Sequence, residues 1–65
     1  EFKNRLKELR MANNLSQMQL AKVLGISQSA IAKWELGKTE PTASAIILVA
    51  KYFKESTDYI LGVID

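Results

Sequence analysis

The sequence contains no cysteine and no histidine. Without cysteine the chain can form no disulfide, and without either residue it lacks the usual ligands of a structural zinc site. The absence of cysteine also fits a protein of the reducing cytoplasm, where we expect this one to act. We therefore predict a fold that is held together by its apolar core, with no metal and no cofactor.

Groups suited to catalysis are also scarce. Apart from the missing histidine and cysteine, the acidic residues are scattered along the chain and form no close pair. The glycines at positions 25, 37 and 62 are too far apart to form a phosphate-binding loop. We predict that the protein is not an enzyme and that it has no small-molecule substrate.

No hydrophobic run is long enough to cross a bilayer, which takes about 18–20 apolar residues. The longest apolar stretch, residues 43–50, is interrupted by Ser44. The first residues, Glu-Phe-Lys-Asn-Arg, do not resemble a signal peptide. The chain begins without Met, so we expect it to be a fragment of a longer protein, and we expect no contact with a membrane.

The 65 residues, of which 48% are hydrophobic, suffice for one compact domain that we assign to residues 1–65. The net charge is only +2, but the charge is distributed unevenly. Residues 1–38 hold seven basic and three acidic residues (+4), and residues 39–65 hold two basic and four acidic residues (−2). A polyanion should therefore approach the first half of the chain.

Apolar residues recur at helical spacing in five segments, which predicts helices over residues 2–12, 17–24, 28–36, 43–53 and 57–61. Good N-cap residues precede the last four of them: Ser16, Ser27, Thr42 and Ser56. Gln19 lies three residues after Ser16, which is the spacing of a capping box. No alternation typical of strands is present, so we predict an all-α fold.

The second and third helices are separated by a short turn that contains Gly25, where a residue without a side chain lets the backbone reverse. Two helices that cross over such a turn form the helix-turn-helix, which we place at about residues 16–36. In this geometry the second of the two helices enters the major groove of DNA.

The third helix has two distinct sides. At 100° per residue, Gln28, Ser29, Ala32 and Lys33 fall on one side, and Ala30, Ile31, Trp34 and Glu35 fall on the other. Gln28 can bridge the N6 and N7 atoms of adenine, and Lys33 can reach guanine or a phosphate. Taken by itself, this side is more typical of an ordinary solvated surface, and its place on the second helix of the motif favours DNA contact. We expect Trp34 to lie in the core.

Other candidate residues lie around this helix. Gln17 stands at the N-terminus of the second helix, where backbone N–H groups favour phosphate. Lys38 and Thr39 follow the third helix in a loop that can lie along a DNA backbone. We expect Arg10 to form a structural ion pair with the Glu35 carboxylate, because a partly buried charge needs a partner. A second group is open between core filler and a self-association surface: Leu48, Tyr52 and Tyr59.

Nearly the whole chain resembles the Cro/C1-type helix-turn-helix family of phage repressors and bacterial regulators. The first part of the shared pattern is Leu15-Ser16-Gln17-x-x-Leu20-Ala21-x-x-Leu24-Gly25-Ile26-Ser27. The second part is Ile31-x-x-Trp34-Glu35-x-Gly37-Lys38-x-x-Pro41. This resemblance implies a five-helix lambda-repressor-like bundle.

The resemblance also implies a function, which is sequence-specific binding of a double-stranded DNA operator by a transcriptional regulator, and we predict a repressor that binds as a homodimer. By analogy the base-reading or supporting positions are Gln17, Gln28, Ser29 and Lys33. The phosphate-contacting positions are Ser16, Lys38 and Thr39. The alternative is a protein-interaction module, such as an antitoxin domain that binds a partner protein.

Two departures from the family pattern stand out. Leu36 occupies a position where the family often has Asn, so a phosphate contact is expected to be missing. Lys54 and Glu55 replace the usual Gly and apolar residue between the fourth and fifth helices. These two residues are unfavourable for the cap at the end of the fourth helix and for one core contact.

Overall fold

The computed structural model describes residues 1–64, and Asp65, the last residue of the expected domain, lies outside the described part. The helices in chain order are α1 (Phe2–Ala12), α2 (Gln17–Leu24), α3 (Gln28–Leu36), α4 (Ala43–Phe53) and α5 (Thr57–Ile60). Residues 1–64 contain no strand. The predicted all-α, five-helix fold is confirmed, and α5 ends one residue earlier than predicted because Leu61 is its C-cap.

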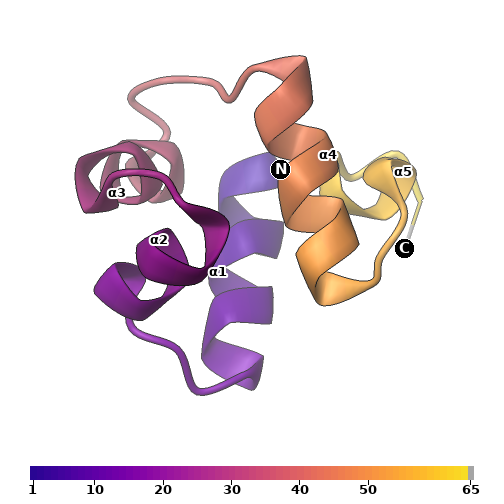
Figure 1. The fold of residues 1–65 in the computed structure, drawn as a ribbon. Coiled ribbons are helices and arrows are strands. Elements are labelled where there is room, and N and C mark those ends of the chain that lie inside the picture. Colours follow the sequence, from indigo (N-terminus) through magenta and orange to yellow (C-terminus); the bar gives the residue numbers. More distant parts are fainter. Residues whose placement is uncertain (65) are drawn as a thin grey trace.

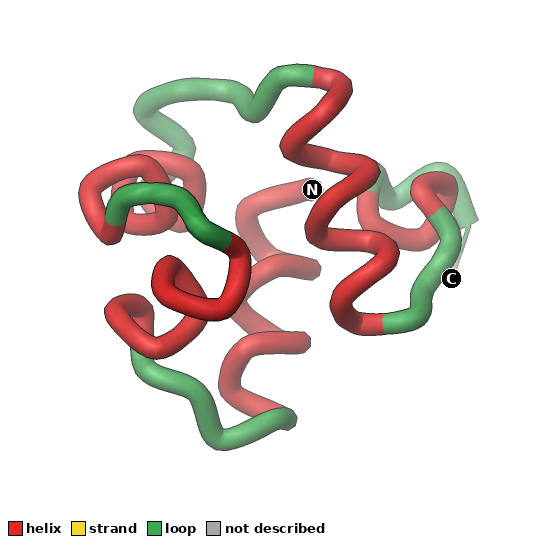
Figure 2. The backbone as a smooth tube through the Cα atoms, viewed as in Figure 1, coloured by secondary structure: helices red, strands yellow, loops and turns green. Residues whose placement is uncertain are grey.

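In Figure 1 the other helices form two groups about α1, and the groups meet where α2 packs against α4. α2 and α3 lie on one side of α1, and α4 and α5 lie on the other. α3 packs against both α1 and α2, while α5 packs against α1 and α4. The connection from α2 to α3 is short, whereas the loop from α3 to α4 passes across the top of the bundle in the view of Figure 2. Among the described residues, no other helix covers the far side of α3.

Every helix contributes one completely buried aliphatic side chain to the core: Leu6, Leu20, Ile31, Val49 and Ile60. Burial of each such side chain stabilises the fold by roughly 1.5–3 kcal/mol. Phe2 and Trp34 meet edge to face beside them, with ring centroids 5.9 Å apart. Leu61, which follows α5, is 42% exposed. The inner side of α3 is thus anchored by an aliphatic and an aromatic residue.

The helix-turn-helix is defined by its caps. The Gln19 backbone N–H donates to Ser16 Oγ at 3.0 Å, and the Ser16 N–H donates to Gln19 Oε1 at 2.8 Å, which completes the predicted capping box. Ser27 Oγ accepts from the Ala30 N–H at 3.1 Å. Gly25 ends α2 with φ +71°, in the left-handed region that favours glycine. These local interactions set the short turn between α2 and α3.

The end of α4 has a left-handed cap made by a residue other than glycine. Lys54 has φ +59° and ψ +41°, and its backbone N–H donates to the carbonyls of Ala50 and Lys51. A side chain in this conformation is strained, because Cβ approaches the following carbonyl oxygen. The cap that was in doubt from the sequence therefore forms, with lysine in a conformation that costs free energy.

We expect Lys54→Gly to raise the free energy of unfolding by about 0.5–1 kcal/mol, since glycine adopts this conformation without strain. Urea denaturation followed by circular dichroism measures the change. Lys54→Ala is the matched control, because it removes the same charge and retains Cβ. Equal stability of the two variants would show that the strain at this cap is negligible.

Candidate nucleic-acid interface

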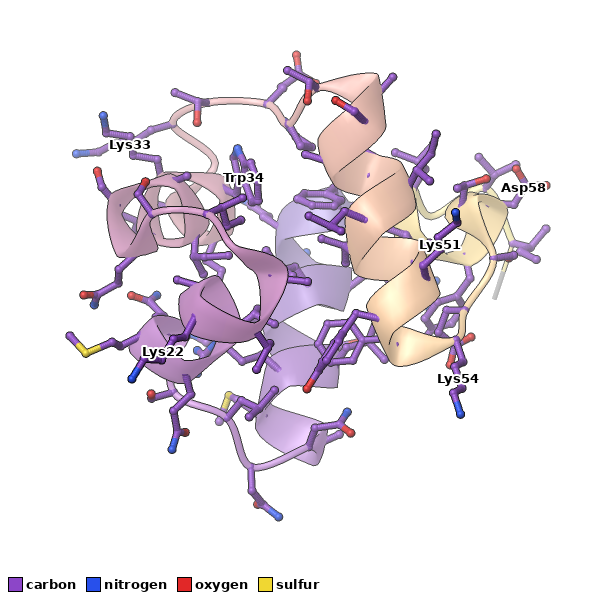
Figure 3. All side chains as sticks on the ribbon, viewed as in Figure 1. Lys22, Lys33, Trp34, Lys51, Lys54 and Asp58 are labelled. Carbon is purple, nitrogen blue, oxygen red and sulfur yellow. The ribbon has the colours of Figure 1, made fainter. Side chains whose placement is uncertain are left out.

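The outer side of α3 carries the polar residues that the helical wheel placed there. Gln28, Ser29 and Lys33 are exposed, whereas Ile31 is fully buried and Trp34 is only 9% exposed. In Figure 3 the Lys33 side chain extends away from the molecule, and Trp34 lies on the side of α3 that faces the bundle. The helix thus presents an amide, a hydroxyl and an ammonium group where no other helix covers them.

The loop after α3 presents two more polar residues beside this surface. Lys38 and Thr39 are both exposed. The Lys38 backbone N–H donates to the Lys33 carbonyl at 2.9 Å, and Gly37 ends α3 with φ +76°. These features hold the start of the loop directly against the last turn of α3. The backbone of Lys38 is therefore fixed next to the last turn of α3.

A lysine from the other end of the sequence also lies at this loop, and sequence reasoning missed it. The aliphatic part of Lys3, on α1, covers Gly37: a Cβ built on that glycine would lie 3.2 Å from Lys3 Cδ and 3.5 Å from Lys3 Nζ. The ammonium of Lys3 therefore adds positive charge next to Lys38. No local pattern reveals this, because the two positions are 34 residues apart and meet only through the packing of α1 on α3.

An ion pair connects α3 to the end of α1. Arg10 Nε donates to Glu35 Oε2 at 2.7 Å, and Arg10 Nη2 donates to Glu35 Oε1 at 3.0 Å. Arg10 Nη1 also donates to the Leu15 carbonyl at 2.8 Å. The two charged side chains are only 12% and 4% exposed. The hydrogen bonds to the Glu35 carboxylate raise the pKa of the Arg10 guanidinium above its usual value.

Gln17 shares the same carboxylate, which the sequence did not indicate. Its Nε2 donates to Glu35 Oε1 at 3.1 Å. An ionised carboxylate can only accept, so the amide nitrogen must face it, and the carbonyl oxygen of Gln17 is free of this bond. Glu35 consequently joins the start of α2 to α1 and α3, and Gln17 holds the two helices of the motif together. A role of Gln17 in base reading must therefore be compatible with its hydrogen bond to Glu35.

Ser16, predicted to contact phosphate, uses its Oγ to accept from the Gln19 N–H and keeps its own hydroxyl hydrogen available as a donor. It stands at the exposed N-terminus of α2. The helix dipole and the unpaired N–H groups of the first turn favour an anion there. The geometry of Ser16 is thus compatible with both a cap and a phosphate contact.

The three residues considered for self-association do not share one environment. On α4, Leu48 is 38% exposed and Tyr52 is 41% exposed, and the neighbouring Ile47 is 48% exposed. Tyr59 on α5 is half-buried against the core, with the Arg5 guanidinium carbon 4.3 Å from the centre of its ring. Of the three residues, Leu48 and Tyr52 are therefore the exposed ones, and we refer to them together with Ile47 as the α4 surface (Ile47, Leu48 and Tyr52).

Within residues 1–64, acidic side chains do not gather in a group of three or more that could hold a metal ion. In the same part of the chain, no helix combines the length and hydrophobicity required to span a membrane. The features that remain are the polar outer side of α3, the basic loop beside it and the N-terminus of α2.

Together these features define a helix-turn-helix domain. In this class of domain the second helix of the motif, here α3, is exposed and can enter the major groove of DNA. A family model described as "Helix-turn-helix" matches residues 6–60. The chain belongs to this Cro/C1-type helix-turn-helix family, and it is a DNA-binding domain of the kind found in transcriptional regulators.

Relatives and a solved structure agree with this assignment. The chain is 41% identical over 62 residues to the HTH-type transcriptional activator BcrR of Enterococcus faecalis, covering 95% of this chain and 30% of that protein. It is 33% identical over 57 residues to the repressor protein C2 of Salmonella phage P22, covering 88% of this chain and 26% of the repressor. A transcriptional regulator from Listeria innocua has a similar structure, with a TM-score of 0.90 and 28% identity, covering 100% of this chain and 61% of that one. The chain thus spans less than two thirds of each of these proteins.

Proposed function

We propose that this domain binds specific sequences of double-stranded DNA by inserting α3 into the major groove. The observation that carries the proposal is the two-sided character of α3. Gln28, Ser29 and Lys33 are exposed, while Ile31 and Trp34 fix the opposite side in the core. A rigidly anchored helix with an uncovered polar side is what direct reading of base edges requires.

Each polar group has a specific partner in this arrangement. Gln28 in the first turn can donate to N7 and accept from N6 of adenine, and Lys33 can donate to O6 or N7 of guanine. Ser29 can contact either a base edge or a phosphate, and the carbonyl oxygen of Gln17 can accept from a base amino group. The phosphate contacts come from Ser16, Lys38 and Thr39.

Titration with mixed-sequence duplex DNA at low and at moderate salt tests the proposal. Binding should be clear at low salt and should weaken steeply as salt rises, because each phosphate contact releases counterions. The competing hypothesis, a protein-interaction module such as an antitoxin domain, predicts no binding even at low salt.

We further propose that two copies bind one operator as a homodimer. The bound dimer represses transcription at that site, and the protein acts in the cytoplasm. A two-fold arrangement places the two α3 helices in successive major grooves about 34 Å apart. The helix α4, which carries the α4 surface, lies apart from α3 and packs against α5 and α2 (Figure 1), so a second copy can contact it without blocking α3. Such a contact is isologous, since each copy offers the same surface. The named relatives include an activator and a repressor, so a reporter with the operator placed across a promoter must decide the direction.

Leu48→Glu is expected to weaken cooperative binding to a full operator by at least tenfold, because it places a charge at the centre of the apolar contact. Binding to an isolated half-site should stay within twofold, because Leu48 does not face the DNA in this arrangement. Gel-shift titrations on both duplexes measure the two effects. The exposed Val23→Glu on α2 is a control for general effects of an added acid. Equal loss on both duplexes would exclude the α4 surface as the dimer contact.

A further inference from the structure

A pocket of about 550 Å³ opens between the N-terminus of α1 and the loop that follows α3. Its lining includes the rings of Phe2 and Trp34 and the two basic residues Lys3 and Lys38. The DNA contacts proposed above use Lys38 alone of these four residues. The pocket therefore holds polar groups that the account has not yet given a role.

The Trp34 side chain brings an unpaired hydrogen-bond donor to this pocket. Trp34 is only 9% exposed, and its indole N–H has no acceptor within residues 1–64. Within the same residues, no completely buried side-chain nitrogen or oxygen lacks a partner, so the indole nitrogen must still reach solvent. A tryptophan buried to this extent usually pairs its N–H. Trp34 thus offers a donor to an acceptor that comes from outside the domain.

Lys3 places a positive charge at the same pocket. Because Gly37 has no side chain, the Lys3 side chain can lie over it: Cδ and Nζ are 3.2 Å and 3.5 Å from the place that a Cβ of Gly37 would occupy. Two carboxylates also line the pocket. The Glu1 side chain packs against Gly62, whereas Glu40 is exposed in the loop. Of the two acids, Glu40 is therefore the one that opposes an anion here.

An indole N–H and two ammonium groups can only donate hydrogen bonds, and two of the three donors are charged. A phosphate group matches this set, because it carries negative charge and several acceptor oxygens and forms strong charge-assisted hydrogen bonds. A neutral ligand would leave both ammonium groups without a charged partner.

We propose that Lys3, Trp34 and Lys38 form a binding site for one phosphate group, whose oxygens accept from the indole N–H and the two ammonium groups. The inference rests on the proposed function for the source of this phosphate, which is then the DNA backbone. It adds Lys3 and Trp34 to the contacts that position α3. A free phosphorylated molecule presents the same chemistry, and the two arms of the experiment distinguish these sources.

The first arm uses inorganic phosphate and no DNA. Trp34 is the only tryptophan of the chain, so its side-chain N–H gives a single NMR signal. This signal should shift and saturate as phosphate replaces chloride at constant ionic strength. Lys3→Gln should weaken the binding about two- to fivefold, the range of an exposed ion pair, and Glu40→Gln should strengthen it.

The matched control is Lys51→Gln, which removes one exposed positive charge from α4. Lys51 lies on the opposite side of the molecule from Lys33 in Figure 3. This variant should bind phosphate and DNA like the unmodified chain.

The second arm uses a duplex selected for tight binding, in which one backbone phosphate at a time is replaced by a neutral methylphosphonate. At one position of each half-site the unmodified chain should lose about tenfold in affinity, the lower end of the range for hydrogen bonds to a charged group. The loss at that position should be smaller for Lys3→Gln and unchanged for Lys51→Gln. The Trp34 signal should shift when the intact duplex binds and should shift less with that methylphosphonate.

The predicted effects in the DNA arm, with or without binding of inorganic phosphate, would support the site with the DNA backbone as its ligand. Phosphate binding by a chain that binds no duplex would refute the proposed function and assign the site to a free phosphorylated molecule. A Trp34 signal that neither phosphate nor bound DNA shifts would overturn the inference. A Lys3→Gln variant that behaves like Lys51→Gln in both arms would overturn it too.

Discussion

Replacing Arg10 with Ala is expected to lower the free energy of unfolding by about 3–5 kcal/mol, because the change leaves the Glu35 carboxylate nearly buried with Gln17 as its remaining side-chain donor. The Leu15 carbonyl also loses its partner. Small domains have a total stability of roughly 5 kcal/mol or slightly more, so Arg10→Ala should be unfolded to a large extent near body temperature. Urea denaturation at 10 °C, monitored by circular dichroism, measures the loss.

Two further variants distinguish the loss of the ion pair from the general effect of removing a positive charge on stability. Lys7→Ala removes an exposed cation from the same helix and should change stability by less than about 0.5 kcal/mol. The double replacement Arg10→Met with Glu35→Leu should be more stable than Arg10→Ala, because no unpaired charge stays buried. An Arg10→Ala variant as stable as Lys7→Ala would contradict the view that this pair holds α3 in place.

The second large effect concerns recognition. Gln28→Ala should cost about 1–3 kcal/mol on the preferred operator, and the cost should come from a single base pair in each half-site. The reason is that Gln28 is exposed in the first turn of α3, where it can make two hydrogen bonds to adenine. Dissociation constants for a set of operators with one base pair changed at a time measure the effect.

Lys38→Ala is the matched comparison, since it removes a contact to the phosphate backbone rather than to a base. It should weaken binding to all sequences alike and reduce the slope of log K against log salt by about 0.9. If Gln28→Ala retained the full sequence preference, the assignment of Gln28 as a base-reading residue would be wrong.

The local structure of the motif is largely predictable from the sequence. The helix boundaries follow from residues that act on their own neighbours: Ser16 and Ser27 bond the N–H groups three residues on, and Gly25 and Gly37 supply the left-handed ends. The two sides of α3 follow equally directly from the helical period. The resemblance to the family added the order and packing of the helices.

What the sequence could not supply depends on how distant elements meet. The bond from Gln17 to Glu35 exists because α2 crosses α3 at one particular position, and the placement of Lys3 over Gly37 depends on the packing of α1 on α3. From its residue type, Tyr59 could be a surface contact residue. In the structure, Arg5 and the core cover much of its side chain. Leu36 could be seen only as a departure from the family pattern, since its exposure of 66% comes from the structure.

Selection of bound sites from a pool of random duplex DNA, followed by sequencing, tests the central claim most directly. If α3 reads bases in the major groove as one half of a dimer, the recovered sites should share a two-fold symmetric pattern with half-site centres 10–10.5 base pairs apart. The same selection with Gln28→Ala should lose preference at one position of each half-site. Recovery of sequences with no common pattern, from a protein that is folded and bound at low salt, would contradict the account.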